Sequence, residues 1–168
     1  GWDVLFRAFL EEFDADEDVR LLVRTYRGGG VTGTGARTIP EIFAEFLATH
    51  GLSNSGRRRI EFLDRMIPNA EMPALYRAAD AFVLPSRGEG WGVPYVESLM
   101  CGVPVVATRW SAPLDFLDDD VAHLVDIDGL VPVDREQVDE NALYAGHRWA
   151  EPAVADLRRC LRDIHGRP

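Results

Sequence analysis

Two carboxylates, Glu89 and Glu97, stand with seven residues between them in the stretch 85–108, and three glycines surround the first acid: Gly88, Gly90 and Gly92. Glycine lets a backbone approach a ligand closely and leaves N–H groups accessible. A helix is expected to begin near Val93, and its positive end favours an anion. We therefore expect the loop amides to hold a polyhydroxyl or phosphate ligand and Glu89 to accept hydrogen bonds from sugar hydroxyls.

Glu97 lies about one turn into that helix, so its carboxylate can point toward the same cleft. A second acid there suits another vicinal diol, such as a ribose, and one acid would then hold each end of a nucleotide sugar. The apolar side chains of the helix are expected to pack on a sheet and fix its register: Val96, Leu99 and Met100. In the alternative interpretation, Glu89 is a solvated loop acid and Glu97 an ordinary acid favoured by the helix dipole.

The elements that must position this loop alternate between helix and strand. Helices are expected over 2–13, 39–50, 71–79, 93–101 and 151–165, with a short one near 113–117. Strands are expected over 18–26, 59–64, 80–85 and 104–108, and the segment 122–129 follows. Thr38 and Glu41 form a capping box before the second helix. This order predicts a Rossmann-like α/β fold, a parallel sheet with helices on both faces, which binds ligands at the carboxyl ends of its strands.

Composition narrows the class of protein. The 168 residues are enough for one domain with a real core, and 46% of them are hydrophobic. The net charge is −10, and a chain that binds a polyanion should be basic, so a nucleic-acid partner is not expected. Every basic residue is Arg. No apolar run reaches membrane-spanning length and no signal peptide is recognisable. The chain lacks an initiator Met, and we expect it to be part of a longer cytoplasmic protein. Cys101 and Cys160 are expected to be plain thiols.

Three other motifs suggest different chemistry. Residues 28–33 fit the motif G-x-G-x-x-G, which is the sole basis for a third hypothesis, a dinucleotide oxidoreductase. However, the next helix is expected to begin near Ile39. That is too far along the chain for the helix amides to hold a pyrophosphate. We interpret 28–33 as a surface loop. The acids 118–120 are expected to be solvated rather than metal ligands, and the arginines 57–59 to be a charged lead-in to a strand.

Several blocks together resemble a known family. They are the run from Leu75 to Ser86, the GEGWG loop, Glu97, and the run CGVPVVAT over 101–108. In these blocks the chain resembles the C-terminal donor-binding half of retaining GT-B glycosyltransferases of the group 1 (GT4) family. The resemblance extends over nearly the whole chain and is loosest across 27–58 and 128–147.

The resemblance implies a role for each matching residue. Glu89 is similar to the family's first acid, a catalytic position that contacts the donor sugar near its reacting carbon. Gly88 belongs to the same loop, and Glu97 is similar to the acid on the ribose. Met66 aligns with a position whose backbone meets the base. The amides similar to the family's sugar and phosphate cradle are those of Gly90, Trp91, Gly92 and Val93. The pattern implies no metal and no other cofactor.

The chain also departs from the family. The Arg and Lys that neutralise the departing diphosphate lie mostly before the position of Gly1, and the acceptor-binding N-terminal domain with its catalytic His is not in the sequence. We expect the longer protein to transfer a sugar from a nucleotide diphosphate sugar with retained configuration, by same-face attack assisted by the diphosphate, in polysaccharide or glycan biosynthesis. The chain alone should be inactive and bind donor weakly. Membrane contact, at the inner face, is expected only through the missing part. The alternative is a catalytically dead module of the same fold.

Overall fold

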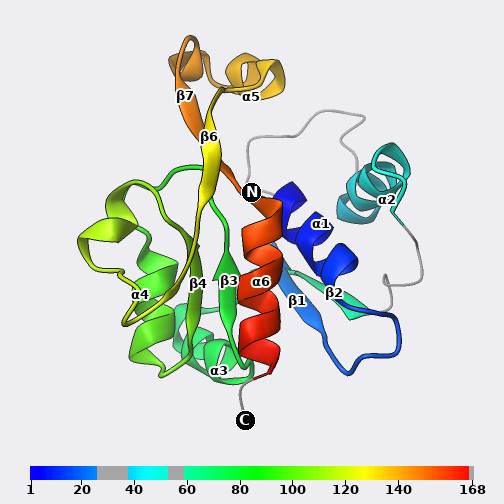
Figure 1. The fold of residues 1–168 in the computed structure, drawn as a ribbon, viewed down its shortest axis with the longest axis vertical. Coiled ribbons are helices and arrows are strands. Elements are labelled where there is room, and N and C mark those ends of the chain that lie inside the picture. Colours follow the sequence, from blue (N-terminus) through cyan, green and yellow to red (C-terminus); the bar gives the residue numbers. More distant parts are fainter. Residues whose placement is uncertain (26–37, 53–58, 167–168) are drawn as a thin grey trace.

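A computed structural model describes residues 1–25, 38–52 and 59–166 (Figure 1). Its strands are β1 Leu21–Thr25, β2 Ile60–Asp64, β3 Phe82–Leu84, β4 Val105–Thr108, β5 His123–Val125, β6 Ile127–Pro132 and β7 Arg148–Pro152. Its α-helices are α1 Trp2–Glu12, α2 Ile39–Thr49, α3 Met72–Arg77, α4 Val93–Met100, α5 Arg135–Glu140 and α6 Val154–His165. The described residues also include the short 3₁₀ helices η2 Asn69–Glu71, η3 Ala112–Asp115 and η4 Ala142–Tyr144.

The strands that carry the expected site are parallel. β3, β4 and β5 form one ladder, with Val106 opposite both Val83 and His123, and β1 pairs in parallel with β2. Over the described ranges these are two separate hydrogen-bonded ladders rather than one continuous sheet. Side chains of both ladders nevertheless pack into one hydrophobic cluster, which includes Val23 of β1 and Val83 of β3.

Both faces of the β3–β5 ladder are covered, as the sequence predicted. Alternate side chains of β4 point to opposite faces. Val106 joins a cluster with α1 and α6, whereas Val105 and Ala107 join a second cluster with Tyr95 of α4. All four residues of β4 are buried, as expected of a strand with a helix on each side.

The N-terminal half has an aromatic core. Phe6 of α1 packs edge-to-face against Phe43 of α2 and Phe62 of β2. The predicted capping box of α2 is confirmed: the amide of Glu41 donates to Thr38 Oγ1, and the amide of Thr38 donates to a Glu41 carboxylate oxygen. Arg59 also joins this core, with its guanidinium over the Phe9 ring, so it is more than a charged lead-in.

The prediction for the C-terminal region was wrong in part. β6 and β7 form an antiparallel ribbon that projects from the body with α5 at its end (Figure 1). Residues 151–152 belong to β7, so the last helix begins at Val154 rather than at Glu151. The reason is tertiary: Glu151 and Pro152 pair with β6, and the amide of Ala150 donates to the Arg87 carbonyl.

The packing predicted for α4 needs one correction. Met100 is 83% exposed, and the fully covered face consists of Tyr95 and Ser98 instead. These two lie three residues apart on one side of the helix, and Leu99 flanks them, whereas Met100 is a further 100° around the axis.

None of the described helices is long and apolar enough to cross a membrane. The G-x-G-x-x-G motif at 28–33 lies outside the described residues.

Candidate functional site

The glycine-rich loop follows β3 and ends where α4 begins, at the carboxyl end of the parallel strands. Gly92 caps α4 in the left-handed conformation, with φ 87° and ψ 46°. A Cβ on Gly92 would lie 2.5 Å from Tyr95 Cδ2 and 3.2 Å from Pro113 Cγ. Glycine is therefore required at this position both for its backbone angles and for space. Pro94 lies in the first turn, where its missing N–H is not needed.

Glu89 is half-buried in this loop, and a neighbouring turn anchors its backbone. The Glu89 amide donates a hydrogen bond to Ser111 Oγ at 3.1 Å. Ser111 has a positive φ of 65°, the one such value at a non-glycine position in the described residues. Non-glycine residues in such sparsely populated backbone conformations cluster at functional sites. Gly88 and Gly90, on either side of Glu89, are exposed, and a Cβ on either would meet nothing within 4 Å.

Glu97 is exposed and already has a hydrogen-bond partner. The Tyr76 hydroxyl of α3 donates to Glu97 Oε2 at 2.9 Å. Burial raises the pKa of Tyr76 above its usual value, and the hydrogen bond to Glu97 raises it further, so the phenol remains a donor at neutral pH. This contact orients the Glu97 carboxylate. A carboxylate has about four acceptor sites, so one bond from Tyr76 leaves others for a ligand diol.

Buried hydroxyl groups hold the base of the loop. Tyr95 Oη donates to the Leu84 carbonyl at 2.8 Å and lies 3.1 Å from Ser86 Oγ. Because the one phenol proton goes to Leu84, Ser86 is the donor to Tyr95. Thr108 Oγ1 donates to the Ser86 carbonyl at 2.7 Å. The ends of β3 and β4 are thus tied to the start of the loop and to α4.

The remaining predicted site residues are accessible. Trp91 and Val93 are exposed in the loop and the first turn of α4, and Trp91 lies against the ring of Phe116, with centroids 5.5 Å apart. Met66 is 67% exposed just beyond the carboxyl end of β2. The structure thus gathers 88–93 and Glu97 on one loop and helix, while Met66 comes from a separate strand end.

The sequence interpretation missed three residues that shape the loop. Tyr76 and Ser111 contact Glu97 and Glu89 from elsewhere in the chain, and Arg87 forms ion pairs with Asp3 and Glu151. Arg87 and Ser111 border recognisable motifs, but their partners are 22 to 84 positions away. No local signal identifies such pairs.

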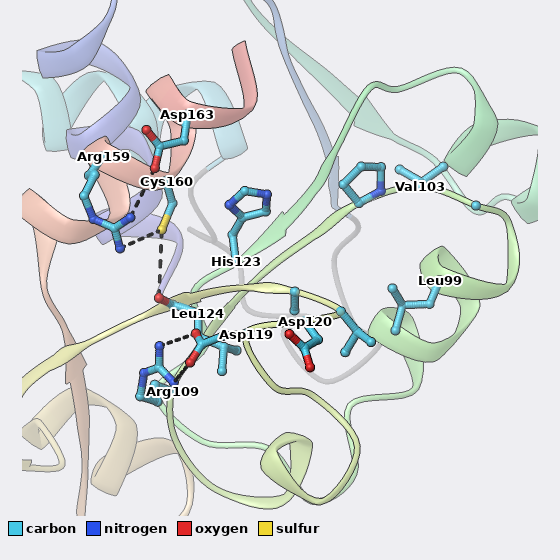
Figure 2. Close-up of a pocket in the computed structure, with 14 residues that line it drawn as sticks. Leu99, Val103, Arg109, Asp119, Asp120, His123, Leu124, Arg159, Cys160 and Asp163 are labelled. Atoms are coloured by element: carbon cyan, nitrogen blue, oxygen red, sulfur yellow. Dashed lines mark hydrogen bonds and ion pairs between the residues drawn. The ribbon is translucent and has the colours of Figure 1, made fainter. Parts of the chain in front are cut away.

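A cavity of about 500 Å³ lies elsewhere, between α6, the end of α4 and the starts of β4 and β5 (Figure 2). Neither predicted acid lines it. Its two arginines are already paired, Arg109 with Asp119 and Arg159 with Asp163. Burial raises the pKa of Cys160 to about 11, so this thiol is protonated at neutral pH, consistent with a plain core thiol. The cavity and the predicted site are different places.

The acidic run 118–120 is exposed, as predicted, and two of its side chains also make contacts within the protein. Asp119 pairs with Arg109, and Asp118 Oδ1 accepts from the Asp120 amide. Over the described ranges, no group of three or more His, Cys, Asp and Glu side chains is placed to hold a metal ion. The expectation that the chain needs no metal stays a prediction.

Comparison with known proteins gives the family. The described fold is an α/β domain with parallel strands and a glycine-rich loop before a helix. The family model "Glycosyl transferases group 1" matches residues 1–144. The chain belongs to the group 1 glycosyltransferases, as the motif blocks indicated.

Relatives and a solved structure agree with this assignment. The chain is 33% identical over 149 residues to D-inositol 3-phosphate glycosyltransferase of Thermobifida fusca, covering 89% of the chain and 32% of that protein. It is 39% identical over 66 residues to O-antigen chain mannosyltransferase B of Escherichia coli, covering 38% of the chain and 17% of that protein. The chain thus spans about a third of the length of the first relative.

The solved structure is the C-terminal domain of a group 1 family glycosyl transferase from Francisella tularensis. It matches with a TM-score of 0.54 at 19% identity, over 98% of this chain and 76% of that one. The fold is therefore that of the C-terminal half of a GT-B protein, as predicted.

Proposed function

We propose that the 168 residues form one nucleotide-sugar-binding domain of a two-domain retaining glycosyltransferase, which moves a sugar from a nucleotide diphosphate sugar to an acceptor in glycan biosynthesis. The observation that carries the proposal is the arrangement of 88–97. The glycine-rich loop and the start of α4 stand between Glu89 and Glu97 in a chain of the group 1 family.

In this proposal, each group contacts a different part of the donor. Glu97, oriented by Tyr76, accepts hydrogen bonds from the ribose diol. The amides of 90–93 and the positive end of α4 face the diphosphate. Glu89 accepts from the hydroxyls of the transferred sugar. The Met66 backbone, at the end of β2, meets the base.

We propose that the reaction also needs groups from outside this chain. Arg87, the cation within the described loop, has both sides of its guanidinium occupied by Asp3 and Glu151. In this proposal the cations that stabilise the departing diphosphate, like the acceptor domain, belong to another part of the full-length protein. We propose a cytoplasmic protein that meets any membrane through that part, because a chain of net charge −10 is repelled by anionic lipid.

The proposal is tested by titrating the chain with UDP, GDP, UDP-glucose and GDP-mannose while following its amide NMR signals. We expect saturable shifts across 88–97 with nucleotides of one base. Glu97→Gln should weaken binding of both the nucleotide and its sugar conjugate by about ten- to a hundredfold, because it removes a charged acceptor. Glu89→Gln should weaken only the sugar conjugate, since Glu89 is assigned to the sugar.

Glu61→Gln is the matched control, an exposed acid of β2 that pairs with Arg20. It should leave binding unchanged. A folded chain that responds to none of the four compounds would overturn the proposal. Donor binding by the chain, together with a full-length protein that transfers no sugar, would instead identify the catalytically dead module.

A further inference from the structure

Arg87 makes a denser set of contacts than its place in a loop would suggest. Its Nη1 and Nη2 donate to the two carboxylate oxygens of Asp3, each at 2.7 Å. Its Nε and Nη2 donate to Glu151 at 2.8 and 2.9 Å. The guanidinium also lies 5.4 Å from the ring centroid of Trp149, and the side chain is only 16% exposed.

The pairing is strong enough to offset burial. Burial by itself would raise the pKa of Asp3, but the hydrogen bonds and charge of Arg87 lower it below its usual value. Bidentate pairs between arginine and carboxylate restrict geometry as well as adding energy. Arg87 is thus held in one place by the two acids.

Those acids come from two different elements. Asp3 belongs to the first turn of α1, and Glu151 belongs to β7 of the projecting ribbon. A backbone hydrogen bond reinforces the link to β7, because the Ala150 amide donates to the Arg87 carbonyl at 3.1 Å. On the other side, Gly1 before α1 lies so close to the loop that a Cβ on it would be 1.8 Å from the Pro85 carbonyl oxygen.

Beyond the ring contact of Trp91 with Phe116, the tip of the loop has little packing of its own. Around Gly88 and Gly90 there is open space, whereas Gly92 is buried against Tyr95. The position of Glu89 is therefore set by the hydrogen bond from its own amide to Ser111 Oγ and by anchors at the two ends of the loop. One end anchor is Gly92 and the other is Arg87.

We propose that Arg87 is a positioning residue: by joining α1 and β7 to the loop, it fixes where Glu89 stands relative to the start of α4. That Glu89 is thereby placed on the sugar of a donor rests on the function proposed above. In this proposal Arg87 acts through the loop and not by contact with the donor, because its guanidinium is occupied by Asp3 and Glu151.

The first test measures the loop without ligand, by amide hydrogen exchange of Glu89 in the chain. Arg87→Met keeps the length of the side chain but removes all four hydrogen bonds, and the Glu89 amide should then exchange about tenfold faster. Arg87→Lys keeps the charge but cannot bridge two carboxylates in a bidentate manner, so its effect should be intermediate.

The matched control is Arg162→Met. Arg162 also joins two elements, donating to Glu12 of α1 and to Glu17, and it lies 4.6 Å from the Phe13 ring centroid. It is on α6, at the other end of α1. Losing it should lower stability without changing Glu89 exchange, so a merely structural effect is distinguished from positioning.

The second test compares affinities for the nucleotide diphosphate and its sugar conjugate. The extra affinity contributed by the sugar is the ratio of the dissociation constant of the nucleotide diphosphate to that of its sugar conjugate. Arg87→Met should reduce this ratio by about tenfold and leave the affinity for the nucleotide diphosphate unchanged. Unaltered Glu89 exchange in a folded Arg87→Met chain would overturn the inference, as would an unaltered affinity ratio. If the unsubstituted chain binds no donor but Arg87→Met still accelerates exchange, the anchor is supported and the proposed function fails instead.

Discussion

At the scale of residues, two tyrosines connect the packing of the fold to the proposed ligand site. Tyr76 orients an exposed acid, and Tyr95 ties α4 to the end of β3. Each hydroxyl donates to a defined acceptor, so each must remain protonated to keep its contact. Their contributions to stability should therefore depend on alkaline pH.

Tyr95 gives the measurable case. Burial raises its pKa to about 12, from an unfolded value of about 10. Because the folded state retains the proton longer, the contribution is fully present below about pH 10 and is lost as pH rises toward 12. Urea unfolding between about pH 10 and 12 measures the free energy of unfolding of the unsubstituted chain and of Tyr95→Phe. The decrease across this range should be about 2 kcal/mol smaller in Tyr95→Phe, which has no phenol to ionise. Equal losses in both proteins would contradict a buried, protonated Tyr95.

At the scale of elements, the transition from loop to α4 depends on one glycine. Gly92 combines a positive φ with a close approach to Tyr95 and Pro113, whereas Gly88 has open space around it. The two glycines are four residues apart in the same loop and so form a natural pair for comparison.

Gly92→Ala should lower the free energy of unfolding by about 1–3 kcal/mol, because alanine is strained at this backbone conformation and its Cβ would displace the Tyr95 ring. Thermal unfolding measures this as a shift of about 2–4 °C for each kcal/mol. Gly88→Ala, the control, should leave the midpoint unchanged. A similar loss in both variants would mean that the loop as a whole, rather than Gly92, resists a side chain.

At the scale of the whole molecule, charge opposes the proposed ligand. The chain carries −10, and the cation in the loop is neutralised by two carboxylates. A nucleotide diphosphate is an anion, so its long-range interaction with this domain is repulsive. In the proposed site, attraction comes from hydrogen bonds and the end of α4.

Salt should therefore not weaken nucleotide binding to the chain. Raising NaCl from about 20 to about 300 mM shortens the screening length several-fold and should leave the dissociation constant unchanged or lower it by about two- to threefold. Isothermal titration at several salt concentrations measures this. A tenfold loss of affinity with salt would reveal a cationic phosphate site within the chain and contradict the assignment of those cations to another part of the protein.

The sequence alone determined the main features of the fold and the candidate loop. Alternation of helix and strand, the capping box at Thr38 and the buried run of β4 are local or periodic signals, and the structure confirms each. The spacing of Glu89 and Glu97 placed both on one loop and helix. Their roles toward a donor stay predictions.

Only the tertiary structure decided how the loop is held. The β6–β7 ribbon, the hydrogen bond from Tyr76 to Glu97 and the ion pairs of Arg87 with Asp3 and Glu151 join residues from 16 to 84 positions apart. Such contacts depend on where the folded chain brings distant side chains. A charged residue in a polar loop looks solvated in the sequence, and its burial becomes apparent only once α1 and β7 lie beside it.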